Sequence, residues 1–211
     1  MNIESFVFNP FMENTYLAYD DTLECVIIDA GCLTLSEQER LKHSIEEKKL
    51  EVKHLINTHL HLDHIFGNGF VFRTFGIKPE AHAADDFLLD QLPAQSAAFG
   101  VPFNEKPQPI GHYLNDGDTI SFGHSTLKVI LVPGHSPGSL CFYNEFDHIL
   151  FAGDVLFWES IGRTDLPKGN YDQLIEGIQN KLLTLPDNTL VYCGHGGSTT
   201  IGHERRENPY L

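Results

Sequence analysis

The sequence predicts an α/β (α+β) protein in which mixed β-sheets carry helices on their outer faces. Strand-like segments rich in β-branched and aromatic residues alternate with amphipathic helical segments, and the first thirty residues alternate like a β-meander. With 211 residues, of which 41% are hydrophobic, the chain is large enough to bury a substantial core. No linker-like stretch divides it, so we expect a single domain over residues 1–211.

The N-terminal half begins with the meander and continues with a helix. Strands are expected at residues 3–8, 14–19 and 25–29. Residues 36–50 then predict an amphipathic surface helix, where Ser36 and Glu39 resemble a capping box. Residues 52–57 predict a short buried strand that runs directly into a histidine-rich segment. This order predicts a junction of strand, loop and helix at the histidines.

The C-terminal half repeats this alternation. Strands are expected at residues 127–132, 139–143, 148–152 and 189–193, and a helix at residues 171–183. Between the halves, residues 87–109 combine a predicted helix with a proline-rich loop. Loops of this length are often functional, so this segment is our candidate for an element that covers the substrate.

Charge excludes some partners. The formal net charge is −15, from 14 Lys and Arg against 29 Asp and Glu, which repels phosphate backbones. The densest basic element, Arg205 and Arg206, is too small for a nucleic-acid track, so we expect no nucleic-acid partner. Bound divalent cations would add positive charge locally, which leaves room for a small anionic substrate.

The N-terminus and the cysteines predict a cytoplasmic location. The opening residues carry no basic leader followed by an apolar stretch, and no apolar run approaches the roughly 18 residues that a membrane span needs. We therefore expect neither export nor membrane insertion. The four cysteines are scattered and are expected to be reduced and mostly buried: Cys25, Cys32, Cys141 and Cys193.

Three imidazoles and one carboxylate stand within six residues, at His59, His61, Asp63 and His64. These are the donors that borderline divalent metals prefer. If the chain stays extended through His61, the first two rings point to the same side. Asp63 and His64 are neighbours and cannot both follow them on a strand, so the backbone must change period here. We infer two metal positions from this change.

Three later loops can supply the remaining ligands. His135 lies in a loop dense in glycine and proline, which can press its ring against an ion. Asp154 ends an apolar strand, where an unpaired carboxylate would be costly. His195 follows the last apolar strand inside a glycine-rich turn. Any one of these three residues alone would more often be structural. The chance that all seven candidate ligands occur together without binding metal is on the order of a few per cent.

The other histidines are expected to be solvated or simply hydrogen-bonded. They are His43, His54, His82, His112, His124, His148 and His203.

The histidine-rich segment and the three later loops, in this order, resemble the metallo-β-lactamase superfamily over nearly the whole chain. The resemblance implies a four-layer αββα sandwich of two mixed β-sheets flanked by helices, with two divalent metal ions at one edge. Zinc is expected, with iron or manganese as alternatives. It implies that His59, His61 and His135 hold one ion, that Asp63, His64 and His195 hold the other, and that Asp154 bridges the two.

The resemblance also implies a hydrolase in which the two ions share a hydroxide that attacks the substrate. Asp63 would orient the attacking water or accept its proton. Residues 158–167 and 201–211 are similar to the short bacterial glyoxalase II-like branch, which implies thioester hydrolysis of hydroxyacylglutathione. Arg163 and Lys168 are candidates for binding an anionic substrate. The alternative for Arg163 is an internal ion pair with Asp165.

Three rival functions stay open. The first is a mononuclear-iron sulfur (persulfide) dioxygenase of the same superfamily, which would use His59, His135 and Asp154. The second is a lactonase or β-lactamase, and the third is a non-catalytic metal-binding protein. The expected partner is a small (thio)ester, with a glutathione conjugate as one form. Longer glyoxalase II enzymes bind glutathione partly through a C-terminal helical domain, whereas this sequence ends 16 residues after His195. The sequence does not predict an oligomeric state.

Overall fold

A computed structural model describes residues 1–101, 103 and 105–211 of the chain. These residues form two compact units, the first made of residues 1–113 with 121–125 and the second of residues 114–120 with 126–211. The described residues form two six-stranded sheets and one two-stranded sheet. Both large sheets contain parallel and antiparallel neighbours, and helices pack on each. The predicted α/β class with two mixed sheets and helices is therefore confirmed.

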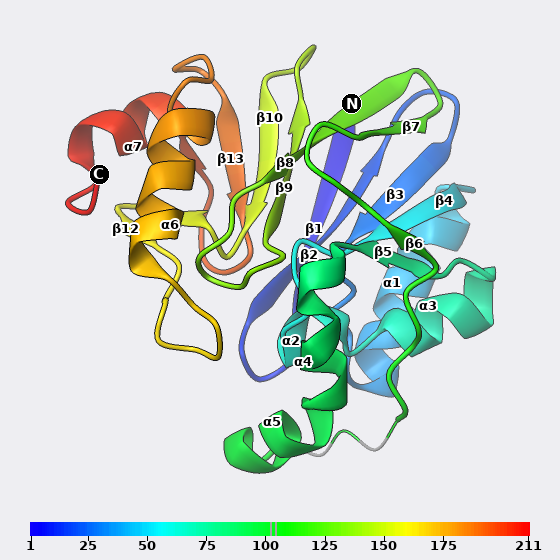
Figure 1. The fold of residues 1–211 in the computed structure, drawn as a ribbon. Coiled ribbons are helices and arrows are strands. Elements are labelled where there is room, and N and C mark those ends of the chain that lie inside the picture. The colour runs from blue at the N-terminus through cyan, green and yellow to red at the C-terminus, as the bar shows by residue number, and fades with distance from the viewer. Residues whose placement is uncertain (102, 104) are drawn as a thin grey trace. The chain divides into compact units, whose positions relative to one another are not determined.

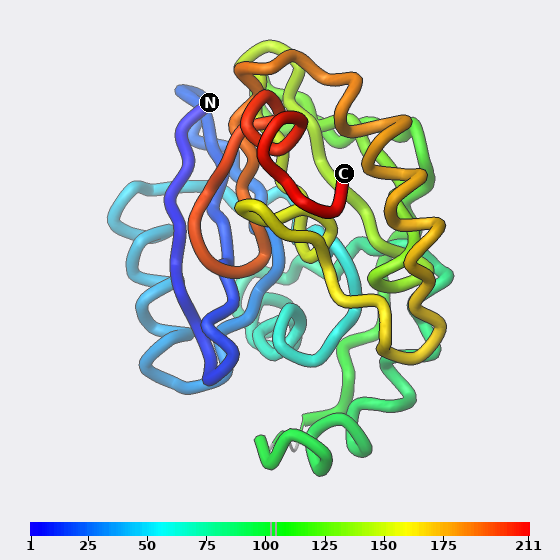
Figure 2. The backbone as a smooth tube through the Cα atoms, turned by 90° about the vertical axis from the view of Figure 1, so that its left-hand side faces the viewer, coloured from blue at the N-terminus to red at the C-terminus, as the bar shows by residue number. Residues whose placement is uncertain are grey.

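The first sheet has the strand order β1-β2-β3-β4-β5-β6. Its strands are β1 (Asn2–Phe8), β2 (Glu13–Tyr19), β3 (Glu24–Ile28), β4 (Glu51–Ile56), β5 (Pro79–Ala81) and β6 (His112–Tyr113). The first three are antiparallel, and Figure 2 shows β1 and β2, in blue, side by side along their length. From β3 to β6 the neighbours are parallel. The four strands predicted in this half are confirmed to within a residue at either end, whereas β5 and β6 are too short to show a period.

Helices of the first unit pack on this sheet and beside the histidine segment. They are α1 (Leu35–Glu47), α2 (Leu62–Ile65), α3 (Asn68–Phe75), the 3₁₀ helix η1 (Ala83–Asp85), α4 (Asp86–Asp90) and α5 (Leu92–Phe99). Leu41 and Ile45 of α1 and Val71 of α3 join strand residues in one core. Helices α1 and α3 lie beside this sheet (Figure 1). Leu88 of α4 packs in a second cluster with Leu60. The helix predicted within residues 87–109 is thus present as α4 and α5.

The role predicted for residues 87–109, covering the substrate, stays a prediction. Pro102 and Asn104 of that segment lie outside the described residues.

The predicted capping box of α1 was wrong by two residues. Thr34 is the N-cap: its hydroxyl accepts the amide of Glu37 at 3.3 Å, and the Glu37 carboxylate accepts the amide of Thr34 at 2.8 Å. Ser36 therefore lies inside the first turn. The same Ser/Thr-x-x-Glu spacing occurs at both positions, and Glu37 is selected because its carboxylate also accepts the backbone amides of Leu33 and Asn9.

The cap leads to a direct test. Thr34→Ala should lower the free energy of unfolding by about 1 kcal/mol, because an amide of the first turn loses its acceptor. Ser36→Ala, at a position that is likewise exposed, should change it by less than about 0.5 kcal/mol. Urea unfolding followed by circular dichroism measures both. Equal losses in the two variants would contradict the assignment of the cap to Thr34.

The second sheet has the strand order β14-β13-β10-β9-β8-β7. Its strands are β7 (Thr119–Phe122), β8 (Ser125–Leu131), β9 (Leu140–Asn144), β10 (Ile149–Gly153), β13 (Leu190–Cys193) and β14 (Thr199–Thr200). A separate two-stranded sheet joins β11 (Leu156–Phe157) to β12 (Ser160–Ile161). Strands β10 and β13 are parallel neighbours. The four strands predicted in this half are present, each shifted by a residue or two.

The second unit has three helical segments in the described chain: α6 (Tyr171–Gly177), the π-helix η2 (Ile178–Leu182) and α7 (Ile201–Glu207). The first two together match the helix predicted at residues 171–183. Leu174, Ile178 and Leu182 bury their side chains against the sheet. Helix α7 was not predicted. Its Arg205 binds Asp187 and the carbonyl of Leu185, the latter at 3.0 Å, so this arginine anchors the C-terminal segment.

All four cysteines are buried thiols. Burial raises the pKa of Cys25 and of Cys193 to about 12, so these thiols stay protonated at neutral pH. The expectation of reduced, buried cysteines is confirmed. No helix in the described part of the chain combines the length and apolar character that crossing a membrane requires.

Asp20 ties residues 121–125 to the first unit. Its carboxylate, in a residue only 7% exposed, accepts the amide of His124 at 2.6 Å and the hydroxyl of Ser125 at 3.0 Å, and it also accepts the amide of Thr22. Burial alone would raise the pKa of Asp20, but the hydrogen bonds from Thr22, His124 and Ser125 lower it from 3.8 to about 2. The ionised form is thus the one that stabilises this link.

The depressed pKa predicts a pH-dependent contribution of Asp20. A carboxyl with a lowered pKa in the folded state stabilises the protein above its ordinary pKa, and this stability is lost as the pH falls through the folded-state value. Asp20→Asn should therefore be less stable than the wild type at neutral pH. The gap should narrow between about pH 4 and about pH 2. Urea unfolding at a series of pH values tests this, and a gap independent of pH would contradict it.

Candidate metal centre

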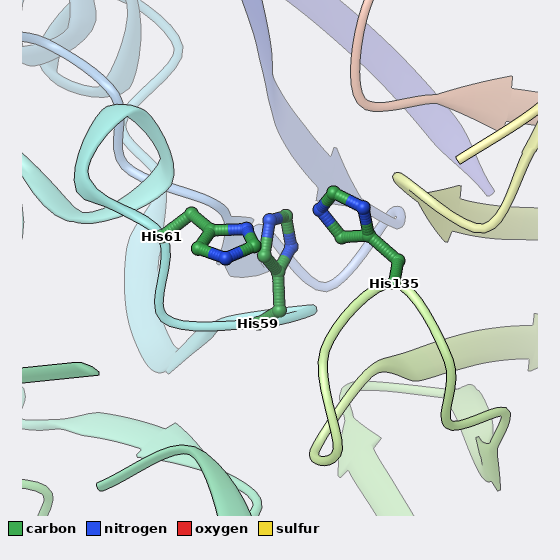
Figure 3. A group of neighbouring side chains, drawn as sticks. All are labelled: His59, His61 and His135. Atoms are coloured by element: carbon green, nitrogen blue, oxygen red, sulfur yellow. The ribbon is translucent and has the colours of Figure 1, made fainter. Parts of the chain in front are cut away.

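The histidine segment of the first unit changes its backbone period, as the sequence predicted. After β4 the chain bends at Thr58, the backbone is extended at His61, and α2 begins at Leu62. The rings of His59 and His61 lie close together, with centroids 4.7 Å apart (Figure 3). The turn of α2 brings the ring of His64 to 4.1 Å from that of His59. Asp63 Oδ2 lies 3.7 Å from His64 Nε2. The first unit therefore gathers all four predicted donors.

Buried leucines fix the direction of these rings. Leu60 and Leu62 alternate with the histidines and are 0% and 2% exposed, in a cluster with Leu88 and Leu92 of the neighbouring helices. The backbone amide of Leu60 is also held, because it donates to the carboxylate of Asp85 at 3.2 Å. Because side chains alternate along extended backbone, a Leu60 turned into the core leaves the flanking rings of His59 and His61 on the other side.

Asp29 orients the imidazole of His64. It follows β3 directly and is 2% exposed, and its carboxylate accepts the Nδ1 proton of His64 at 3.0 Å, the amide of Thr58 at 2.7 Å and the hydroxyl of Thr58 at 2.6 Å. With its proton on Nδ1, His64 has its lone pair on Nε2, the form in which imidazole binds metals. The hydroxyl of Thr58 also lies 3.0 Å from Nδ1 of His59, where it sets the same tautomer.

The sequence analysis missed Asp29. Its signal was the same as that of Asp154, a carboxylate directly after an apolar strand.

A second buried acid lies beside this group. Glu13 of β2 is 0% exposed and accepts the hydroxyl of Thr15 at 3.0 Å. Donor atoms of Glu13, Asp29 and His64 lie within 4.8 Å of one another. Burial raises the pKa of Glu13 well above its ordinary value, and the nearby charges of Asp29 and Asp63 raise it further. The protein interior thus favours the protonated form of Glu13, which the sequence gave no reason to single out.

The second unit gathers two of its predicted donors, His135 and His195, around one carboxylate oxygen of the third, Asp154. Asp154 follows β10 and His195 follows β13, and these parallel strands end side by side, with Gly153 opposite Cys193. Asp154 Oδ2 lies 3.5 Å from Nε2 of His195 and 3.6 Å from Nε2 of His135. Nδ1 of His135 donates to the carbonyl of Arg163 at 2.8 Å, which places the lone pair of this ring on Nε2.

Two glycines make this arrangement possible. Gly134 has a φ of +140°, and a Cβ there would lie 2.5 Å from that of Leu174. A Cβ on Gly162 would collide with the carbonyl oxygen of Asp154. The tight loop predicted around His135 is therefore confirmed, and Gly162 is a further position where a side chain would displace Asp154.

Arg163 and Lys168 are the two residues predicted to bind substrate. Arg163 binds Asp165 through Nε at 2.7 Å and Nη2 at 2.8 Å, and this guanidinium lowers the pKa of Asp165 to about 2. The alternative of an internal ion pair is thus observed. Lys168 is exposed and has a φ of +64°. A role in substrate binding stays a prediction for both.

Several of the remaining histidines are hydrogen-bonded outside this set, as expected. His54 binds Glu80 at 2.6 Å, His148 binds Tyr143 at 3.2 Å, and His203 binds Glu159 at 3.1 Å.

Comparison with known proteins identifies the family. The family model of the metallo-beta-lactamase superfamily matches residues 8–195. The chain belongs to this superfamily, and the predicted resemblance and fold are confirmed.

Three similar proteins cover the chain almost end to end. Hydroxyacylglutathione hydrolase GloC of Haemophilus influenzae is 39% identical over 100% of this chain and 98% of that protein. The crystal structure of BLEG-1 B3 metallo-beta-lactamase is 36% identical with a TM-score of 0.90, over 100% of this chain and 99% of that one. TTHA1623, solved in a di-iron-bound form, is 32% identical with a TM-score of 0.88, over 99% of this chain and 100% of that one.

The orienting role of Asp29 can be tested by Asp29→Asn. Asparagine keeps the size and tolerates the positive φ of +53°, but it removes the negative charge that holds the proton on Nδ1 of His64. Loss of such an outer contact should lower zinc affinity about 10- to 100-fold. Competition with a chromophoric chelator measures this. Asp20→Asn is the matched control, because it removes a hydrogen-bonded carboxylate from the same unit that contacts none of the proposed metal ligands. Wild-type affinity in Asp29→Asn would refute the role.

Proposed function

We propose that this protein is a metal-dependent hydrolase of the hydroxyacylglutathione hydrolase type that uses a pair of divalent ions. The observation that carries the proposal is the position of one carboxylate oxygen of Asp154 between the Nε2 atoms of His135 and His195. A carboxylate so placed is suited to bridge two ions, the role that the resemblance implies for it. The four donors of the first unit supply the rest of the set.

The proposed ligands fall into groups that could each hold an ion. By the resemblance to the superfamily, His59, His61 and His135 would hold one ion and Asp63, His64 and His195 the other, with Asp154 shared between them.

The chemistry of the donors fits two divalent cations. Neutral imidazole and carboxylate suit zinc, iron and manganese alike. In each unit the rings are set to offer Nε2, by Asp29 and Thr58 in the first and by the carbonyl of Arg163 in the second. When bound, such a pair of cations would lower the pKa of a shared water towards about 7.

Asp63 is the residue we assign to the attacking water. Its side chain is 16% exposed, whereas that of its neighbour His64 is 0% exposed. A water can therefore reach this carboxylate, which would orient it and accept its proton. Buried His64 would serve only as a ligand.

A thioester is the substrate class that the relatives favour. The supporting observation is the 39% identity to hydroxyacylglutathione hydrolase GloC across the full length. The similarity to a B3 metallo-beta-lactamase makes a β-lactam the competing substrate to test.

The decisive experiment combines metal analysis with a substrate panel. Purified chelator-free protein should hold up to two divalent ions and hydrolyse S-lactoylglutathione in preference to a β-lactam, a lactone or a persulfide. Asp154→Ala should lower this activity by more than about a hundredfold, because it removes a shared ligand and not merely an outer contact. Asp147→Ala, an exposed aspartate just before the other end of β10, is the control and should keep wild-type activity.

Each part of the proposal can fail separately. Protein without zinc, iron or manganese would refute the metal centre, and near-wild-type activity in Asp154→Ala would refute the bridging role. Hydrolysis of a β-lactam alone would overturn the thioester assignment. Oxygen uptake with glutathione persulfide by protein holding a single iron would replace the hydrolase with a dioxygenase.

A further inference from the structure

One amide side chain joins three distant segments of the first unit. Asn9 lies in the turn between β1 and β2, with a φ of +50°. Its Nδ2 donates to the carbonyl of Gly31 at 3.0 Å and to the carbonyl of Asp63 at 2.9 Å. These acceptors lie 22 and 54 residues further along the chain. Asn9 thereby links the turn to the loop after β3 and to helix α2.

The orientation of this amide is fixed by its other contacts. Oδ1 accepts the backbone amide of Phe11 at 3.0 Å, so the oxygen faces a donor while the nitrogen faces two carbonyls. The backbone amide of Asn9 donates to the carboxylate of Glu37 at 2.7 Å. Glu37 belongs to the cap of α1, so the turn itself is held from a second side.

The two carbonyls that Asn9 binds belong to segments in direct backbone contact. A Cβ on Gly31 would lie 2.8 Å from the carbonyl oxygen of Asp63 and would collide with the carboxylate of Glu13. The carbonyl oxygens of Gly31 and Asp63 both lie within 3.0 Å of Nδ2 of Asn9, and two such oxygens repel each other unless a donor lies between them. The NH₂ group of Asn9 supplies one N–H to each.

Helix α2 depends on such outside contacts. It has only four residues, and its N-cap, His61, makes no side-chain capping hydrogen bond. A single turn gains little stability from its own hydrogen bonds. The bonds that hold it include those from Asn9 to the carbonyl of Asp63 and from Asn57 to the carbonyl of His64, the latter at 3.1 Å.

We propose that Asn9 is a positioning residue for the Asp63 and His64 side of the metal centre. The loop it binds carries Asp29, which orients His64, and the helix it binds carries Asp63 and His64 themselves. By clamping one to the other, the amide fixes the distance between a ligand pair and the carboxylate that aims it. This inference rests on the proposed function and adds to it a residue from the β1–β2 turn.

Two substitutions separate the amide from the backbone. Asn9→Gly keeps the left-handed turn and the backbone bond to Glu37 but removes the clamp. Asn9→Asp also tolerates the positive φ, but it places a negative charge against two carbonyls. We expect one of the two zinc equivalents to bind about tenfold more weakly in Asn9→Gly, with a larger loss in Asn9→Asp. The other equivalent should keep its affinity.

Zinc titration of chelator-stripped protein against a chromophoric chelator measures both equivalents. The d–d absorption of the Co²⁺-loaded protein reports the ligand geometry independently of turnover, and it should change in both variants. Asn208→Ala is the matched control. Asn208 also donates through Nδ2, to the carbonyl of Ser160 at 3.0 Å, and accepts the amide two residues later at 3.0 Å. Its loss should lower the melting temperature without changing zinc affinity.

The outcomes distinguish this proposal from the one it rests on. Wild-type zinc affinity in Asn9→Gly, or equal weakening of both equivalents in Asn9→Gly and Asn208→Ala, would overturn the positioning role and leave the hydrolase intact. Failure of the wild-type protein to bind zinc, iron or manganese would instead overturn the metal centre. Weaker binding of one zinc equivalent in Asn9→Gly, with a larger loss at the same equivalent in Asn9→Asp, supports the positioning role of Asn9.

Discussion

The register of one parallel strand pair in each unit is the constraint on which the candidate site depends. In the first unit, Ile28 at the end of β3 pairs with Ile56 at the end of β4. In the second, Gly153 at the end of β10 pairs with Cys193 at the end of β13. Because parallel strands have their carboxyl ends at the same edge, the residues that follow each pair emerge together. A slip of one residue in either pair would turn the following side chains to the opposite face.

The two units then orient their imidazoles by different acceptors. In the first unit a buried carboxylate, Asp29, accepts the Nδ1 proton of His64, and the charge makes this a strong hydrogen bond. In the second unit His135 donates to the neutral carbonyl of Arg163. The guanidinium of the same arginine holds Asp165. A substitution of Arg163 that disturbs the loop would therefore reach His135 through the backbone, without any contact between the guanidinium and the ring.

Local periodicity predicted the long strands and the seven donors, because each donor follows an apolar run or a change of backbone period. It could not predict contacts that join distant segments. Nothing near Asn9 in the sequence indicates that its amide binds Asp63, and the choice of Thr34 over Ser36 as the cap depends on contacts that Glu37 makes with Leu33 and with the β1–β2 turn. The shortest strands were not predicted for another reason: a segment of two or three residues is too short to show a hydrophobic period.

A left-handed residue at each strand end explains why two similar aspartates have different tasks. At the end of β3 this residue is Asp29 itself, with a φ of +53°, and the bend turns its carboxylate back towards Thr58 and His64. At the end of β10 it is Gly153, with a φ of +49°, so the bend is complete before Asp154 and the carboxylate projects past the strand towards His135 and His195. The position of one bend relative to one aspartate thus decides whether that aspartate orients an imidazole or stands among the donors.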